Sequence, residues 1–405
     1  MEFNKIFAPL KIRNYRLYFL GQGISQSGNR MQLVAQSWLV FSITGSGLAL
    51  GLLAAFQFLP ILLFGAWGGV IADRFSKRKI LYCTQLISGA LALILAMFVI
   101  FGWIKVWMVY ISAFALGLVD AINSPTEHTF IIEMVREKEL PGAIALNAIE
   151  TNFARVLGPA FAGFLIVYFS LGFCFLINAF SYIAVVIVLF MMDAKELYCA
   201  SLIKATKGRL WEGITYIKSS IFMKNVLFMS LIVGSLACEF AVSLPLLAKF
   251  TFNGNAGTYS ILLSAMGVGS LIGGLFMAAH RKTTFNVFVF ITFLFGVFIL
   301  ATAVSPILFM AISLLVIVGF FHIYFSSLGN TILQLESVPE MRGRVTAIWI
   351  VAYSGSVLIG GPIIGWVSQY ASPRWGLAIG GIAALLAAGI GAKDLKKKYK
   401  AIPEE

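Results

Sequence analysis

Charged residues are scarce in this sequence. Only 12% of the 405 residues are Asp, Glu, Lys or Arg, whereas 60% are hydrophobic. Soluble domains carry roughly twice that share of charge, so a water-soluble fold could not hide this much apolar surface. Many apolar runs exceed the ~20 residues that cross a bilayer, and in lipid each run must be helical because its amides need internal partners. The composition therefore indicates an all-α polytopic membrane protein.

Cysteine is also rare, and several familiar catalytic motifs are missing. The four cysteines show neither metal-ligand spacing nor a disulfide framework, so we expect no metal site. The chain contains no Gly-x-Ser-x-Gly elbow, no His-Glu-x-x-His and no Gly-x-x-x-x-Gly-Lys-Ser/Thr loop. These absences argue against an ATP-driven pump and against a membrane-embedded enzyme, which is the rival from a different class. We expect no catalytic residues and no cofactor.

Twelve apolar segments are long enough to be membrane spans. The first six, which form a predicted N-terminal bundle over 1–192, are 15–42, 47–72, 80–102, 106–131, 142–169 and 172–192. The last six, which form a predicted C-terminal bundle and basic tail over 223–405, are 223–250, 257–279, 285–303, 307–334, 342–370 and 375–392. The polar stretch 193–222 separates them. Its second part, RLWEGITYIKSS, predicts an amphipathic helix on the cytoplasmic membrane surface.

The net charge of +13 suggests nucleic acid at first, but its distribution argues otherwise. When the connectors are assigned alternately to the two sides of the membrane, one side collects nearly all the Lys and Arg. That side includes the clusters Arg74–Lys79 and Lys393–Lys400. By the positive-inside rule it is cytoplasmic, and both termini lie there. We therefore expect a multi-pass protein of the bacterial inner membrane that binds no nucleic acid.

The two halves of the chain repeat each other at an offset of 203 residues, as Gly158 and Gly361 illustrate. The matches are Gly158-Pro159 with Gly361-Pro362, Glu133 with Glu336, and Lys77–Lys79 with His280–Lys282. Six spans per half preserve direction, so the repeats are parallel. Transporters built this way place their substrate site near the membrane midplane between the repeats.

The connector after the second span carries the most specific motif, Gly69-Val-Ile-Ala-Asp73-Arg74-Phe-Ser76-Lys77-Arg78-Lys79. It resembles the signature loop of the major facilitator superfamily, Gly-x-x-x-Asp-Arg-x-Gly-Arg-Arg/Lys, with Ser76 replacing the second glycine. The resemblance implies the major facilitator fold of two parallel six-helix repeats. It also implies a cytoplasmic latch that holds the outward-facing state. Asp73 and Arg74 would form this latch, with Lys77 and Arg78 supporting it; a merely topogenic positive loop is the alternative.

Shorter motifs are similar to the enterobactin-exporter and macrolide-efflux branch of that superfamily. They include Asn14-Tyr15-Arg16, Ser25–Asn29, Thr44-Gly45-Ser46 and Asn123-Ser-Pro125. Gly158 and Pro159 are similar to a fifth-helix motif of drug exporters, where they permit a close helix approach and a kink, although plain packing explains them equally well. The resemblance implies a monomeric secondary transporter that exports a hydrophobic or amphipathic drug, macrolide or siderophore by alternating access. Lysophospholipid movement, metal or siderophore uptake, and nutrient import or uniport are the rivals.

Polar residues at bilayer depth are costly, so they usually face a cavity or a partner. The first, fourth and fifth spans each carry such residues on one face: Gln26, Asn29 and Arg30; Asp120, Asn123 and Glu127; and Arg155. Because helices 1, 4, 7 and 10 line the cavity of this superfamily, we expect these residues to line a substrate and proton cavity. We further expect Arg30, Asp120 and Arg155 to form a charge cluster. A self-neutralising structural network is the alternative.

The second half offers two candidate proton carriers. Glu239 lies midway along the seventh span and His322 midway along the tenth, and the two form a possible relay. Each could equally be a hydrogen-bonded core group. Several exporters of the superfamily place a proton-binding Asp on helix 1, where this chain has Asn29, which cannot titrate. We therefore predict that protons and a small molecule are the partners and that other carboxylates carry the proton.

Overall fold

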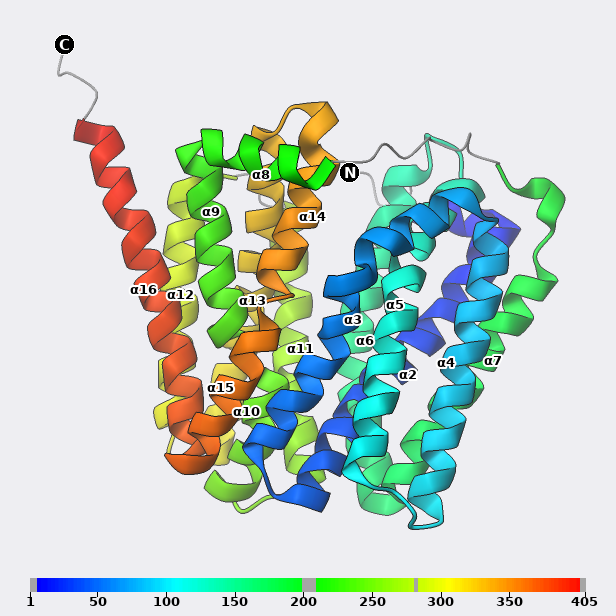
Figure 1. Ribbon diagram of the computed structural model, residues 1–405, viewed down its shortest axis with the longest axis horizontal. Coiled ribbons are helices and arrows are strands. Elements are labelled where there is room, and N and C mark those ends of the chain that lie inside the picture. Colours follow the sequence, from blue (N-terminus) through cyan, green and yellow to red (C-terminus); the bar gives the residue numbers. More distant parts are fainter. Residues whose placement is uncertain (1–5, 199–208, 280–282, 401–405) are drawn as a thin grey trace. The chain divides into compact units, whose positions relative to one another are not determined.

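The computed structural model describes residues 6–198, 209–279 and 283–400 (Figure 1). These residues are almost entirely helical and contain no strand. They divide into two compact units. The first unit comprises Met1–Thr44 with Phe56–Ala205, and the second comprises Gly45–Ala55 with Thr206–Glu405.

The first unit is a bundle of long helices. Its helices are α2 (Arg13–Thr44), α3 (Gly47–Arg74), α4 (Lys77–Ile100), α5 (Val106–Met134), α6 (Leu140–Tyr168) and α7 (Leu171–Met191), with short 3₁₀ turns η1 (Ala8–Lys11) and η2 (Ala194–Glu196). The first residues of α3 are counted with the second unit. Within the first unit α2 packs against α6 and α7, and α4 packs against α5 and α7 (Figure 1). Gly102 ends α4 at a φ of 72°, which glycine adopts without strain.

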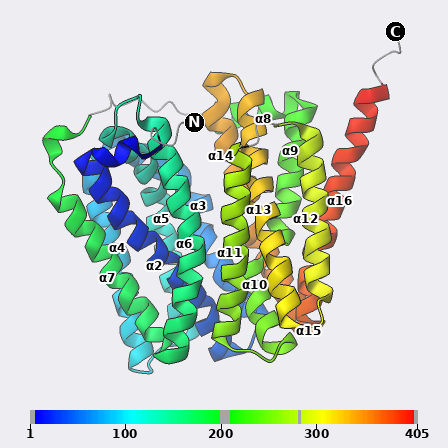
Figure 2. The same ribbon diagram turned by 180° about the vertical axis from the view of Figure 1, so that it is seen from behind.

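The second unit repeats this plan with more interruptions. Its elements are α8 (Arg209–Ser219), α9 (Ile221–Ile232), η3 (Val233–Ala237), α10 (Phe240–Leu246), η4 (Leu247–Thr251), α11 (Ala256–Ala279), α12 (Phe285–Val304), α13 (Leu308–Glu336), η5 (Pro339–Met341), α14 (Arg342–Tyr353), α15 (Val357–Tyr370) and α16 (Pro373–Lys400). The helix α11 packs against α13, and α12 packs against both α13 and α16 (Figure 2). Buried phenylalanines fill the space between α12 and α13, where the Phe288 and Phe325 rings stack 4.8 Å apart.

Two membrane segments of the second unit are broken near their middles. After α9 the chain makes the π-helical turn η3 and leaves helical geometry at Cys238 and Glu239 before α10 begins. The break between α14 and α15 falls after Tyr353. The two breaks lie side by side, because a Cβ added to Gly234 would collide with the Tyr353 carbonyl oxygen. The sequence predicts each segment as a single span and gives no sign of the interruption.

The number of long helices matches the predicted number of membrane spans. Eleven helical segments among the described residues are long and apolar enough to cross a bilayer. The helix α2 has 32 residues, which is also long enough, but Gln22, Gln26 and Arg30 make it more polar. With α2 included, the described residues supply twelve membrane helices, so the predicted all-α class is confirmed.

The helix α8 lies across the ends of α9 and α14 (Figure 1). Its Glu212 forms an ion pair with Arg344. The Tyr216 hydroxyl accepts a hydrogen bond from the Val338 amide at 3.2 Å, and Ile217 is buried. One side of the predicted amphipathic helix therefore packs on protein, and its contact with the membrane surface stays a prediction.

Candidate functional site

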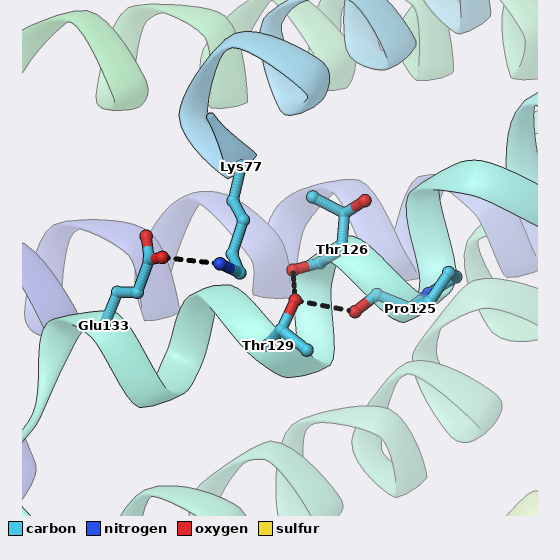
Figure 3. A network of polar contacts seen from close by, with 5 residues as sticks. All are labelled: Lys77, Pro125, Thr126, Thr129 and Glu133. Carbon is cyan, nitrogen blue, oxygen red and sulfur yellow. Dashed lines mark hydrogen bonds and ion pairs between the residues drawn. The ribbon is translucent and has the colours of Figure 1, made fainter. Parts of the chain in front are cut away.

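The motif from Gly69 to Arg78, here called the latch motif, joins α3 to α4 in the first unit. Lys77 Nζ lies 2.6 Å from Glu133 Oε1, and the two side chains are only 9% and 14% exposed (Figure 3). One turn earlier on α5, the Thr129 hydroxyl lies 2.9 Å from the Pro125 carbonyl oxygen and 3.1 Å from that of Thr126 (Figure 3). Lys77 therefore ties the start of α4 to the end of α5.

Arg78 holds the end of α7. Its guanidinium donates hydrogen bonds to the Leu189 carbonyl at 2.6 and 2.9 Å and to the Met192 carbonyl at 3.1 Å. The last carbonyls of a helix have no partner within the helix, and a cation there also complements the helix dipole. The same guanidinium lies 5.8 Å from the centre of the Tyr82 ring. Two basic residues of the latch motif thus stabilise the first unit itself.

The other residues of the latch motif are more accessible. Asp73 is half-buried in the last turn of α3, and Arg74 is exposed. Ser76 has a φ of −58°, so this position does not require the positive φ that a glycine would allow, and serine fits it. The corresponding residues of the second half, 280–282, lie outside the described residues. That Asp73 and Arg74 act as a latch stays a prediction.

Glu127 is the centre of a hydrogen-bonded cluster between α2 and α5. Its Oε1 accepts from Gln22 Nε2 at 2.6 Å and from Asn123 Nδ2 at 2.8 Å, and its Oε2 lies 3.5 Å from Gln26 Nε2. The Thr84 hydroxyl of α4 in turn donates to Asn123 Oδ1 at 2.7 Å. The polar faces predicted for the first and fourth spans therefore meet. Thr84 is a member of this cluster that no sequence pattern singles out.

Asn29 and Arg30 are adjacent in the sequence but have different partners. Asn29 Oδ1 accepts hydrogen bonds from the Tyr182 hydroxyl at 2.5 Å and from Asn178 Nδ2 at 3.4 Å, both on α7. Asn178 is not among the predicted site residues, although a polar residue inside the apolar run 171–191 can be recognised from the sequence. Arg30 interacts electrostatically with Asp120. Asp120 is exposed although it lies within a membrane helix.

Gly158 and Pro159, the residues of the predicted fifth-helix motif, lie on α6, and Gly158 lies where α6 packs against α2. A Cβ added to Gly158 would collide with the Arg30 Cβ and would crowd the Ser27 carbonyl oxygen, so glycine permits this close approach. The helix α6 runs through Pro159 without interruption. Arg155 lies half-buried one turn before Gly158. The kink at Pro159 and the membership of Arg155 in the charge cluster stay predictions.

Glu239 occupies the break between η3 and α10 in the second unit. Its side chain is 5% exposed, and Oε1 is buried with no hydrogen-bond partner among the described residues. Gly361 of α15 lies beside it, since a Cβ on Gly361 would be 3.5 Å from Oε2. Burying a carboxylate without a partner costs free energy, so such a group calls for a functional explanation.

His322 reaches the same break through Tyr353. The Tyr353 hydroxyl lies 3.0 Å from His322 Nε2 and 3.5 Å from Cys238 Sγ. Cys238 and Tyr353, two residues that no sequence pattern singled out, therefore connect His322 to the break that contains Glu239. In the part of the chain that the structure describes, no three His, Cys, Asp or Glu side chains gather as metal ligands would.

A sequence profile described as transmembrane secretion effector matches residues 4–401. The chain belongs to this family of major facilitator transporters. The transporter is 24% identical over 338 residues to a staphyloferrin A transporter of Staphylococcus aureus, with 82% of each chain covered. It is 23% identical over 352 residues to macrolide efflux protein A of Streptococcus pyogenes, covering 84% of this chain and 86% of that relative.

Solved structures of other transporters share the fold. A bacterial homologue of the human lysosomal transporter Spinster superposes with a TM-score of 0.72 at 14% identity, covering 94% of this chain and 96% of that one. The nucleoside transporter NupG gives a TM-score of 0.73 at 13% identity, covering 96% and 99%. At this level of identity the likeness concerns the fold alone. The family match, and not this likeness, makes the chain a multi-pass membrane transporter of a small molecule, and its named relatives include bacterial proteins.

Proposed function

We propose that this transporter exports an amphipathic small molecule in exchange for protons by alternating access. The names of its relatives support the cargo class, since they include a staphyloferrin A transporter, macrolide efflux proteins and the multidrug efflux pump Tap of Mycolicibacterium fortuitum. Macrolides and siderophores are both bulky molecules with polar and apolar parts. We further infer that the protein is a monomer of the bacterial inner membrane with both termini in the cytoplasm.

The observation that carries proton coupling is the buried carboxylate of Glu239 at a break in a membrane helix. Broken helices in transporters commonly mark substrate and coupling-ion sites, because their ends expose polar backbone groups. A carboxylate buried without a hydrogen-bond partner can be neutralised by a proton, and it can give up that proton when a conformational change opens it to water. We assign the proton to Glu239, with Cys238, Tyr353 and His322 as its polar surroundings.

The polar face of the first unit is our candidate for cargo recognition. Asp120 and Arg30 offer charges of both signs at membrane depth. Gln26, Asn123 and Glu127 form the hydrogen-bonded cluster beside them. Charged and amide groups of this kind would orient the polar part of an amphipathic cargo.

The proposal is tested by transport in proteoliposomes that contain no ATP. Erythromycin and staphyloferrin A are compared as cargoes under an imposed proton gradient, with wild-type protein, Glu239→Gln, Asp120→Asn and the control Glu137→Gln. Glu137 is exposed in the connector after α5 and takes no part in the proposed machinery. We expect gradient-dependent export of at least one cargo by wild type and E137Q, and a fall of about tenfold or more in E239Q.

The outcomes separate the parts of the proposal. Export at the same rate with and without the proton gradient would contradict proton coupling. Full gradient-driven export by E239Q would show that another carboxylate carries the proton. Cargo movement only in the inward direction would make the protein an importer. A D120N variant that keeps its proton dependence but loses affinity for the cargo would support the division of roles between the two units.

A further inference from the structure

A groove of about 890 Å³ opens on the surface of the first unit between α2, α6 and α7. Its walls are mostly large apolar side chains that remain exposed, among them Ile24, Phe153, Leu157, Phe161 and Phe180. Because these side chains lie on membrane-spanning helices, their exposed surfaces meet hydrocarbon and not water. The volume falls within the range of small-molecule sites, roughly 300–1,000 Å³.

One acidic residue lies among these apolar walls. Glu150 of α6 is the single ionisable side chain among the described residues that line the groove. It is 8% exposed, and its Oε1 is buried with no hydrogen-bond partner in the part of the chain that the structure describes. Gly23 of α2 leaves room beside it, since a Cβ there would lie 3.9 Å from Glu150 Cγ.

The other polar side chains that line the groove already have hydrogen-bond partners within the protein. The Ser27 hydroxyl donates to the Gly23 carbonyl at 2.8 Å, and the Ser181 hydroxyl donates to the Asn178 carbonyl at 2.7 Å. Glu127 lies close enough to add its negative charge to the field at Glu150. The groove therefore combines apolar walls with one carboxyl group whose buried oxygen has no partner among the described residues, and a cation carried on an apolar body would stabilise the ionised form of that group.

We propose that this groove binds a lipophilic monocation that arrives from the bilayer, with Glu150 as its counter-ion. An ammonium or phosphonium centre would lie against the carboxylate, and its hydrocarbon or aromatic groups would lie along the phenylalanines of α6 and α7. Such a ligand exchanges contacts with lipid for contacts with the apolar walls, and its charge gives the buried carboxylate a partner. A phospholipid acyl chain would fill the space between the same walls, but it would leave the carboxylate oxygen without a partner.

The test is equilibrium binding of radiolabelled tetraphenylphosphonium to the full-length protein in phosphatidylcholine nanodiscs. Glu150→Gln removes the charge with little change of shape, and Ala184→Phe adds a bulky side chain to the groove wall on α7 and leaves Glu150 itself unchanged. Glu137→Gln is the matched control, since it makes the same carboxylate-to-amide change in an exposed connector. We expect saturable binding by wild type and E137Q, about tenfold weaker binding by E150Q, and none by A184F.

A neutral ligand of similar shape checks the role of the charge. Triphenylphosphine oxide should bind wild type and E150Q about equally. Equal tetraphenylphosphonium affinity in wild type and E150Q would overturn the proposal, as would absence of saturable binding to wild type. Native mass spectrometry that finds a phospholipid retained by wild type, lost in A184F and not displaced by tetraphenylphosphonium would make the groove a lipid site instead. Binding needs no gradient, so a failure of proton-driven export would leave this result unaffected.

Discussion

Buried carboxylates in this transporter differ in whether the protein itself supplies their partners. Glu133 has Lys77 at 2.6 Å, and Glu127 accepts from the amides of Gln22 and Asn123. Glu239 and Glu150 each keep a buried oxygen without a partner among the described residues. Glu133 and Glu127 therefore have partners within the first unit, whereas Glu239 and Glu150 are the groups for which we propose an external proton or cation as partner.

Removing Lys77 should destabilise the first unit. Lys77→Gln leaves the mostly buried Glu133 carboxylate without its cation, and we expect a loss of about 1–3 kcal/mol of stability. The readout is the midpoint of thermal denaturation of the purified protein in detergent. Lys79→Gln, at an exposed position directly after the latch motif, is the control and should cost less than about 0.5 kcal/mol. Equal midpoints for K77Q and K79Q would show that the ion pair contributes nothing.

Tyr353 gives a second test at the scale of a residue. Tyr353→Phe removes the hydroxyl between His322 and Cys238 and keeps the ring that stacks on Trp349. We expect gradient-driven transport to fall by about tenfold, while cargo affinity changes by less than about twofold. Transport rates and equilibrium cargo binding are measured on the same preparation. Tyr370→Phe, at an exposed tyrosine, should leave both unchanged. Unchanged transport by Y353F would exclude the hydroxyl from the proton path.

At the scale of elements, small residues decide which helices can touch. Gly158 brings α6 against the backbone of α2. Gly361, its counterpart in the internal repeat, lies on α15 against the backbone of Gly51 at the start of α3. Close backbone contacts of this kind are typical of membrane helices, which gain no hydrophobic driving force from lipid. The same repeat position is therefore used for the same physical purpose in both units.

The two glycines of the first unit's motifs should respond differently to one added methyl group. Gly158→Ala forces α6 away from α2 and should lower stability by about 1–3 kcal/mol. Gly69→Ala adds a methyl group that meets no atom within 4 Å and improves helix propensity, so it should be neutral or stabilising by up to about 1 kcal/mol. Thermal denaturation in detergent measures both. A G69A variant that is stable but inactive would show that Gly69 is needed in another conformation; a fully stable G158A would contradict the packing account.

At the scale of the whole molecule, the chain is arranged by charge as well as by hydrophobicity. Connectors rich in Lys and Arg alternate with connectors that hold few of them along twelve spans, which predicts cytoplasmic termini. The orientation is indicated by the unequal distribution of Lys and Arg between the two sides of the membrane, and not by the net charge of +13.

Reporter fusions test this orientation. Alkaline phosphatase fused after Lys105, in the connector between α4 and α5, should be active because it is exported. The same enzyme fused to the C-terminus should be inactive, and green fluorescent protein at that position should fluoresce. Activity of the C-terminal phosphatase fusion would reverse the predicted topology and with it the side of the membrane on which the latch motif lies.

Much of the architecture was predictable because its signals are local. Apolar length predicts a membrane helix, and the span predicted at 15–42 coincides with the more polar α2. The polar faces around Gln26 and Asn123 were predictable for the same reason, since helical spacing places such residues together. Their partners on other helices, such as Thr84 and Tyr182, depend on which helices pack together, and no spacing in one segment contains that information.

The sequence by itself determined that this protein lies in lipid, its helical class, its internal repeat and the residues of its latch motif. These features follow from hydrophobic length and motif spacing, which are properties of neighbouring residues. Only the tertiary structure decided that Lys77 pairs with Glu133, that Tyr353 joins His322 to the break beside Glu239, and that Glu150 lines an apolar groove. Each of these depends on distances between residues on different helices. Those distances are set by close packing across the bundle, which the order of residues along one helix does not specify.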